Sequence, residues 1–167
     1  MIFEDLYGKD MLIRSQIDVY RTVINEMLPV DERAVNYRKT QFLVLHTGGE
    51  HVLDILITPA HDNNFPIHIS MGAESATLAL GGWREVYPPK NTPDMTIADI
   101  TRHLIEEIPL LLGGYCKIVE HRAGGKGYKW DRFDFIDGEW RFRSQSSVLL
   151  YNFFGDKTSE ELFCKLT

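Results

Sequence analysis

The amino-acid sequence predicts an α+β protein in which an antiparallel sheet of about six to eight strands, arranged as two meanders, packs against two main helices and a short C-terminal helix. Short apolar-alternating segments follow one another through turns too short for crossover helices, which predicts antiparallel pairing. Longer segments repeat their apolar residues at helical spacing instead. With 167 residues, 44% of them hydrophobic, we expect one domain covering residues 1–167.

The first main helix is expected over residues 10–28. Asp10 is a suitable N-cap and Pro29 stops the helical pattern. The apolar positions fall on one stripe, which predicts docking by that stripe. These positions are Ile13, Ile17, Tyr20, Ile24, Met27 and Leu28.

Residues 65–87 are expected to form the central hairpin of the sheet. Two alternating apolar runs flank a Gly-Ala-Glu-Ser turn, and the segment ends in two glycines followed by aromatic residues. Two further strands are expected before this hairpin, over residues 41–46 and 52–58. The four strands together predict the first meander.

The second main helix is expected to follow Thr96. Thr96 and Asp99 have the spacing of a capping box, in which each side chain bonds the backbone of the other. A wide apolar face follows, which is typical of a helix that packs on a sheet. Pro109 is expected to kink or end this helix, and Gly113 with Gly114 to finish it.

The C-terminal third predicts a second meander over residues 115–121, 128–136, 139–143 and 148–154. Asp137-Gly138 is a strong signal for a type I′ hairpin turn. Thr158 and Glu161 have capping-box spacing, which predicts a short terminal helix with Leu162, Phe163 and Leu166 facing inward.

The net charge of −6 disfavours indiscriminate nucleic-acid binding and suits a basic partner. No apolar run has the length of a membrane span, and the N-terminus lacks the layout of a secretory signal, so we expect residence in the cytosol and no membrane association. Cys116 and Cys164 show no metal-binding spacing and are expected to be reduced. No cofactor and no metal site are predicted.

No catalytic residue is assigned, because the sequence contains no nucleophile motif. One alternative is a small-ligand-binding or hydrolytic α+β enzyme with His46, His68 or His121 at the mouth of a pocket. The competing interpretation is that these histidines are ordinary surface or hydrogen-bonded residues.

A further alternative is RNA binding at residues 126–143, where aromatic residues alternate with Lys and Arg. Tyr128, Trp130 and Phe142 could then stack on bases while cations contact phosphates. The four acidic residues in this segment repel phosphate, which favours a plain hairpin with cross-strand charge pairs.

The segment from Leu80 to Tyr87, Leu-Gly-Gly-Trp-Arg-Glu-Val-Tyr, together with the helix from Ile97 and the hairpin at residues 124–130, resembles small bacterial immunity-type proteins of polymorphic-toxin and contact-dependent growth-inhibition systems. In that family the tryptophan is often followed by a His-x-His pattern. Arg84 and Val86 stand at those two positions here, so no role of the histidines carries over.

The resemblance implies a non-enzymatic protein that binds and neutralises a cognate toxin domain, with a nuclease among the candidates. An acidic inhibitor of a basic nuclease gains association rate from charge complementarity. We expect the partner to contact acids and aromatics near the hairpin ends and the second helix. The chosen residues are Glu85, Tyr87, Asp94, Glu106, Glu107 and Trp130.

Overall fold

The computed structural model describes residues 35–36, 39–47, 50–60, 65–89, 92, 94–148 and 156–163. Within these ranges the chain forms two antiparallel sheets and one helix, α3 (Ile97–Leu112). The first sheet has five strands in the order β1-β2-β3-β4-β5, and the second has four in the order β8-β7-β6-β9. No helix in these ranges has the length and apolar character that a membrane crossing requires.

The first sheet is a simple meander in which every strand pairs with the next one along the chain. Strands β3 and β4 alternate strictly between buried and half-buried residues, as expected for a sheet with one covered face. The strands are β1 (Gln41–Thr47), β2 (Glu50–Ile57), β3 (Ile67–Met71), β4 (Ala76–Leu80) and β5 (Trp83–Tyr87).

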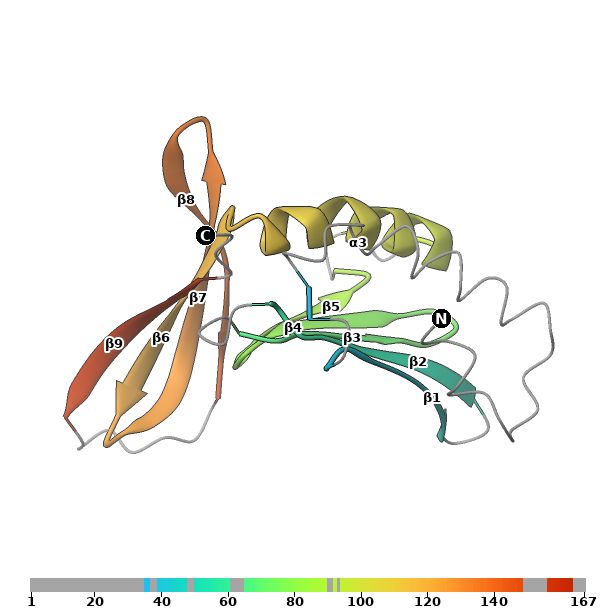
Figure 1. Ribbon diagram of the computed structural model, residues 1–167, viewed down its shortest axis with the longest axis horizontal. Coiled ribbons are helices and arrows are strands. Elements are labelled where there is room, and N and C mark those ends of the chain that lie inside the picture. The colour runs from blue at the N-terminus through green and yellow to red at the C-terminus, as the bar shows by residue number, and fades with distance from the viewer. Residues whose placement is uncertain are drawn as a thin grey trace.

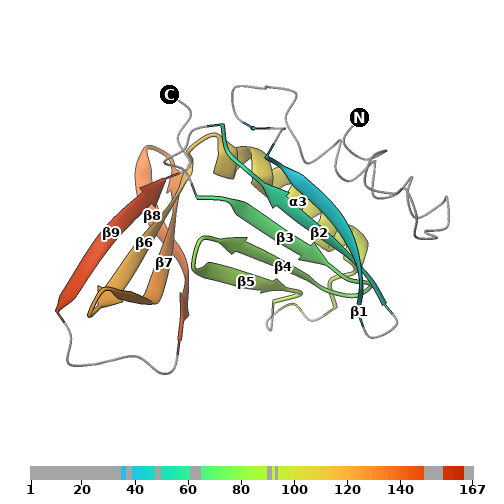
Figure 2. The same ribbon diagram turned by 60° about the horizontal axis from the view of Figure 1, so that its bottom comes forward.

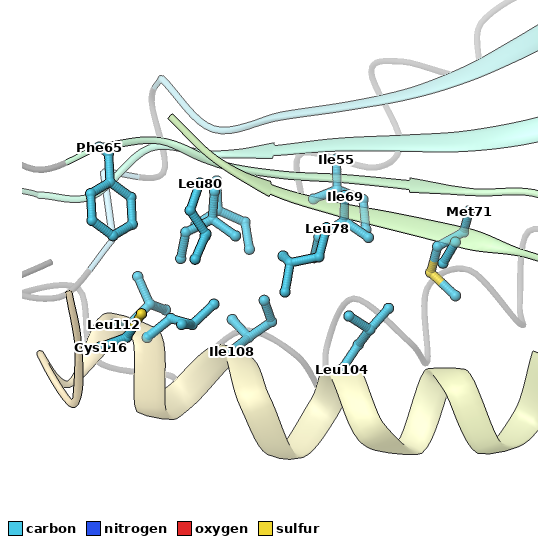
Figure 3. Packing of buried hydrophobic residues seen from close by; sticks show 14 of the residues in the cluster. Ile55, Phe65, Ile69, Met71, Leu78, Leu80, Leu104, Ile108, Leu112 and Cys116 are labelled. Atoms are coloured by element: carbon cyan, nitrogen blue, oxygen red, sulfur yellow. The ribbon is translucent and has the colours of Figure 1, made fainter. Parts of the chain in front are cut away.

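Helix α3 covers one face of the first sheet, and the core lies between them (Figure 1). Figure 3 shows Leu104 and Ile108 of α3 pointing toward Ile69 and Leu78 of the sheet. Each of these side chains is fully buried, and burial of such a side chain contributes about 1.5–3 kcal/mol.

The ends of α3 confirm most of what the sequence predicts. The Thr96 hydroxyl accepts a hydrogen bond from the Asp99 amide at 3.2 Å, and the Asp99 carboxylate accepts one from the Thr96 amide at 3.2 Å. The helix ends at Gly113, as expected. Pro109 does not end the helix, which continues to Leu112; the Pro109 carbonyl accepts the Gly113 amide at 2.8 Å.

The second sheet is built from the C-terminal third of the chain. The turn between β7 and β8 places Asp137 at φ 54° and Gly138 at φ 85°, which fits the predicted type I′ turn. The strands are β6 (Cys116–Ala123), β7 (Lys126–Ile136), β8 (Glu139–Ser147) and β9 (Lys157–Phe163).

The predicted fold class is wrong in two respects. The strands divide into two sheets instead of one, and residues 157–163, expected to begin a C-terminal helix, form strand β9. Strand β9 pairs along β6, and the pairing adds cross-strand ion pairs from Lys117 to Glu161 at 2.8 Å and from Arg122 to Glu160 at 3.0 Å. The stabilisation from pairing with β6 exceeds that of the capping box predicted at Thr158 and Glu161. The predicted helix at 10–28 and residues 149–154 of the predicted last strand lie outside the described residues.

The second sheet stands beside the end of the first sheet where β4 turns into β5, next to the C-terminal end of α3 (Figures 1 and 2). The contact is close: a Cβ atom added to Gly82 would lie 2.2 Å from the Trp130 ring. The Arg84 amide donates to the Ser146 hydroxyl at 3.3 Å, and the Arg132 guanidinium lies 4.9 Å from the centre of the Trp83 ring. This junction positions the hairpin β7–β8 over the end of α3.

Candidate functional site

A pocket of about 250 Å³ lies where the C-terminal half of α3 meets β7 and β8. Its walls come from α3, from the start of β6, which follows α3 after three residues, and from the hairpin β7–β8. The lining residues are His103, Glu106, Glu107, Leu110, Leu111, Tyr115, Cys116, Arg132, Asp134, Phe135, Ile136 and Arg143.

Glu107 of α3 is the centre of the pocket floor. Its carboxylate is 4% exposed and forms an ion pair with Arg132 of β7, which is equally buried. The Tyr87 hydroxyl donates to Glu107 Oε2 at 3.1 Å, and His103 Nε2 lies 3.2 Å from the same oxygen. Arg143 of β8 is 3.8 Å from Oε1. One carboxylate therefore joins β5, α3, β7 and β8.

The pKa of Glu107 shows how strongly this carboxylate is held. Burial alone would raise the pKa, but the hydrogen bond with His103 and the charges of Arg132 and Arg143 outweigh burial and lower it to about 2. Glu107 is therefore ionised at all physiological pH values. The same hydrogen bond raises the pKa of His103, against the opposing effect of burial.

Asp134 completes the network by bridging the two arginines. Its carboxylate oxygens lie 2.9 Å from Arg132 Nε and 3.0 Å from Arg143 Nη1. Both arginines are thus neutralised by carboxylates within the protein. A buried pair of this kind is costly to break, because removal of one partner leaves an uncompensated charge.

Tyr87 and Cys116 border the network as neutral groups. Burial and the nearby charges of Glu107 and Glu85 raise the pKa of Tyr87, so its hydroxyl stays protonated and serves as a donor. Burial raises the pKa of the Cys116 thiol to about 12, which leaves it a poor nucleophile. The ionisable groups of the floor are paired with one another, and their contacts hold β5, α3, β7 and β8 together.

The rim of the pocket is apolar and exposed. Leu110 and Tyr115 are 55% and 52% exposed, and Phe135 and Ile136 are 39% and 44% exposed. Phe142, 58% exposed, lies on β8 outside the pocket lining, on the face of the second sheet that carries Phe133. These five side chains, which we call the hairpin surface, are five of the eight exposed large hydrophobic residues in the described ranges.

Two residues of the hairpin surface, Phe135 and Phe142, each contact a neighbouring aromatic ring. The Phe135 ring lies 5.1 Å from Trp140 and the Phe142 ring lies 5.8 Å from Phe133, as distances between ring centroids. Lys117 Nζ lies over both inner rings, 5.6 Å from the Phe133 centroid and 5.1 Å from the Trp140 centroid. The exposed rings of Phe135 and Phe142 therefore each pack against a neighbouring aromatic side chain.

Three of the predicted partner-contact residues lie at this site. Glu106 is exposed and lines the pocket, and Glu107 is buried in its floor; Tyr87, only 2% exposed, is not in the lining but hydrogen-bonds Glu107 from β5. Glu85 is half-buried, and its Oε2 lies 3.2 Å from the Tyr87 hydroxyl oxygen.

The other two predicted contact residues lie elsewhere. Asp94 is exposed just before the N-terminal end of α3, at the opposite end of the helix from Leu110. Trp130 is half-buried against Gly82, and its Nε1 donates to Glu120 at 3.2 Å. Neither belongs to the pocket lining.

The sequence interpretation missed the apolar rim and the two arginines. Leu110 carried a usable signal, because it is an apolar residue outside the α3 stripe that runs through Ile100, Leu104, Ile108 and Leu111. A single exposed apolar side chain is ordinary, so this signal indicates a contact surface only together with the other exposed apolar residues of the rim. Arg132 carried no such signal, since its burial depends on how the second sheet meets α3.

The histidines proposed for an enzyme are not brought together. His46 and His68 lie on β1 and β3, which are separated by β2. His68 Nε2 instead contacts Asp54 at 2.8 Å, in a separate hollow of about 280 Å³, and His121 Nε2 contacts Asp131 at 2.8 Å in the other sheet. The described part of the chain contains no group of three or more potential metal ligands.

The aromatics proposed for RNA binding are divided between the two faces of the second sheet. Trp130 packs toward Gly82, whereas Phe142 packs on Phe133, whose side chain points away from that of its neighbour Arg132. Tyr128 is half-buried, with its ring 6.3 Å from that of His121. The three rings do not form one stacking platform.

Comparison of the chain with models of protein families, with curated proteins and with solved structures found no significant match. The chemistry of the pocket and its rim is therefore the guide to function.

Proposed function

We propose that the protein is an immunity protein that binds a cognate toxin domain in the cytosol and neutralises it through the hairpin surface. The supporting observation is the concentration of exposed large apolar side chains around one pocket, at Leu110, Tyr115, Phe135 and Ile136, with Phe142 exposed nearby on the same hairpin. Exposed apolar residues scattered singly are ordinary, but a gathering of them marks a contact surface. Aromatic side chains at the centre of such a surface are favoured binding anchors.

The network beneath the hairpin surface favours tight binding. Arg132 and Arg143 of the hairpin are tied to Glu107 of α3 and to Asp134. A surface held in place before the partner arrives loses less conformational entropy on binding. The partner then docks against a preformed shape.

Neutralisation requires no chemical step by this protein. Covering the active site or the substrate entrance of the toxin is sufficient, and an acidic inhibitor of a basic nuclease associates faster because their charges attract. The net charge of −6 suits this role. The floor of the pocket also fits a binding role, because Glu107 and Arg132 form an ion pair with each other.

The test is binding and protection with the polypeptide encoded beside this chain in its genome. We expect a complex and survival of cells that express that polypeptide. Leu110→Ser should weaken the complex at least tenfold, since a central anchor contributes about 2 kcal/mol or more and tenfold corresponds to about 1.4 kcal/mol. Val86→Ser is the matched control: Val86 and Leu110 are both 55% exposed, but Val86 lies on the first sheet.

Two results would refute the proposal. One is the lack of both a complex and protection by the wild-type protein. The other is equal weakening by Leu110→Ser and Val86→Ser, which would place the contact elsewhere.

A further inference from the structure

Building on the proposed function, we infer that the partner inserts one apolar side chain into the pocket and places a lysine or arginine beside it, against Glu106 and Glu139. The inference concerns the chemistry of the partner segment: a basic peptide segment with an apolar anchor. The size of the pocket, its apolar rim and the distribution of unpaired charge around it support this chemistry.

The pocket is small for a metabolite or cofactor. Its volume of about 250 Å³ falls below the roughly 300–1,000 Å³ typical of small-molecule sites. The opening is bordered by the side chains of Leu110, Tyr115, Phe135 and Ile136. A single apolar side chain from a protein partner would fill such a space and bury these exposed atoms.

The cations around the pocket are already paired. Arg132 and Arg143 share Asp134, and Arg141 Nη2 lies 3.4 Å from Asp137 near the hairpin turn. An acidic partner would have to compete with these internal carboxylates for the same guanidinium groups. Acidic segments and nucleic-acid phosphates are therefore disfavoured at this surface.

Two acids, one in the pocket lining and one on β8 opposite the lining residue Ile136, have no ion-pair partner among the described residues. Glu106 is an exposed residue of the pocket lining on α3. Glu139 is exposed at the start of β8, directly opposite Ile136 in the strand pairing. One free carboxylate therefore belongs to the α3 side of the pocket and one to the hairpin side, and both attract a cation adjacent to the apolar anchor.

Three blocked tripeptides probe this chemistry without knowledge of the partner: acetyl-Arg-Leu-Arg-amide, acetyl-Arg-Ser-Arg-amide and acetyl-Glu-Leu-Glu-amide. Each is titrated into the full chain while NMR signals of Leu110, Leu111 and Ile136 are followed. We expect the Arg-Leu-Arg peptide to shift these signals in a saturable manner and the other two to bind at least tenfold more weakly. Equal binding of all three, or no shift with any of them, overturns the inference.

Charge-neutralising variants then test the two acids. Glu106→Gln and Glu139→Gln should each weaken binding of the Arg-Leu-Arg peptide about two- to fivefold and reduce its dependence on salt, as expected for exposed ion pairs. Glu74→Gln is the control, because Glu74 is exposed in the turn between β3 and β4. An effect of Glu74→Gln equal to theirs would contradict the assignment.

The two proposals can fail separately. If the neighbouring polypeptide does not bind but the peptide preference holds, the immunity function is wrong and the binding chemistry stands. If the polypeptide binds in a Leu110-dependent manner while Glu106→Gln and Glu139→Gln leave its affinity unchanged, the function stands and the charge assignment is wrong.

Discussion

Glu107 connects more elements of the site than any other single residue does. The sequence presented it as one of two adjacent surface acids, Glu106 and Glu107, but only Glu106 is exposed. Glu107 stands seven residues after Ile100 and three after Leu104, which places it on the apolar stripe of α3. Its burial was therefore visible in the helical spacing. Its partner Arg132 was not, because the two residues meet only after the second sheet docks.

Replacement of Glu107 should be strongly destabilising. Glu107→Ala leaves Arg132 buried with Asp134 as its remaining close carboxylate, and we expect a loss of about 3–5 kcal/mol in the free energy of unfolding. Urea denaturation measures this directly. Glu106→Ala, one residue away but exposed, should change stability by less than about 0.5 kcal/mol. A loss below about 1 kcal/mol for Glu107→Ala would show that the network does not hold the junction.

The ionisation of Glu107 also predicts a dependence of stability on pH. Its pKa is about 2 in the folded protein and 4.5 in the unfolded chain, so its contribution is complete above about pH 4.5 and is lost as the pH falls toward 2. The difference corresponds to about 3 kcal/mol. Between pH 6 and pH 2, the wild type should lose about that much more stability than Glu107→Gln.

The contribution of His103 to stability depends on pH in the opposite direction. Its pKa is raised in the folded protein, so its contribution is present below about pH 6.5 and declines as the pH rises through the folded value. Parallel acid profiles for the wild type and Glu107→Gln would contradict the assignment of the acid-sensitive contribution to Glu107.

At the scale of elements, the features predicted well were those encoded by neighbouring residues. The capping box at Thr96 and the type I′ turn at Asp137 both formed, because each depends on side chains within four residues of one another. The segment at Thr158 carried the same kind of local signal and still became strand β9. There the partner strand β6 lies far away in sequence, and its pairing determined the outcome.

Close packing at the junction between the two sheets depends on Gly82, which has no side chain. A Cβ atom at Gly82 would lie 2.2 Å from the Trp130 ring, so Gly82→Ala should force the sheets apart and destabilise the protein by about 1–3 kcal/mol. Thermal unfolding followed by the near-ultraviolet circular dichroism of the tryptophans measures this. Gly72→Ala is the control, since its added Cβ meets only ordinary contacts of 3.8 Å and longer. Equal stability of the two variants would argue against tight packing at the junction.

At the scale of the whole molecule, the alternation of apolar residues located most strands but did not divide them into two sheets. Strand positions follow from local periodicity, whereas the choice of partner depends on contacts such as that of Gly82 with Trp130. The same limit explains why only part of the candidate site could be predicted from the sequence. Glu106, Glu107 and Tyr87 were chosen from sequence and lie at the pocket, but the apolar rim arises only when α3 and the hairpin β7–β8 come together.

In our proposal, a toxin domain binds to the hairpin surface. Hydrogen exchange of the backbone amides, with and without the polypeptide encoded beside this chain, locates the contact. We expect slower exchange at residues 113–115 and 135–142 in the complex and little change in strands β1 to β4. Slowing confined to β1–β4, with residues 113–115 and 135–142 unchanged, would contradict it.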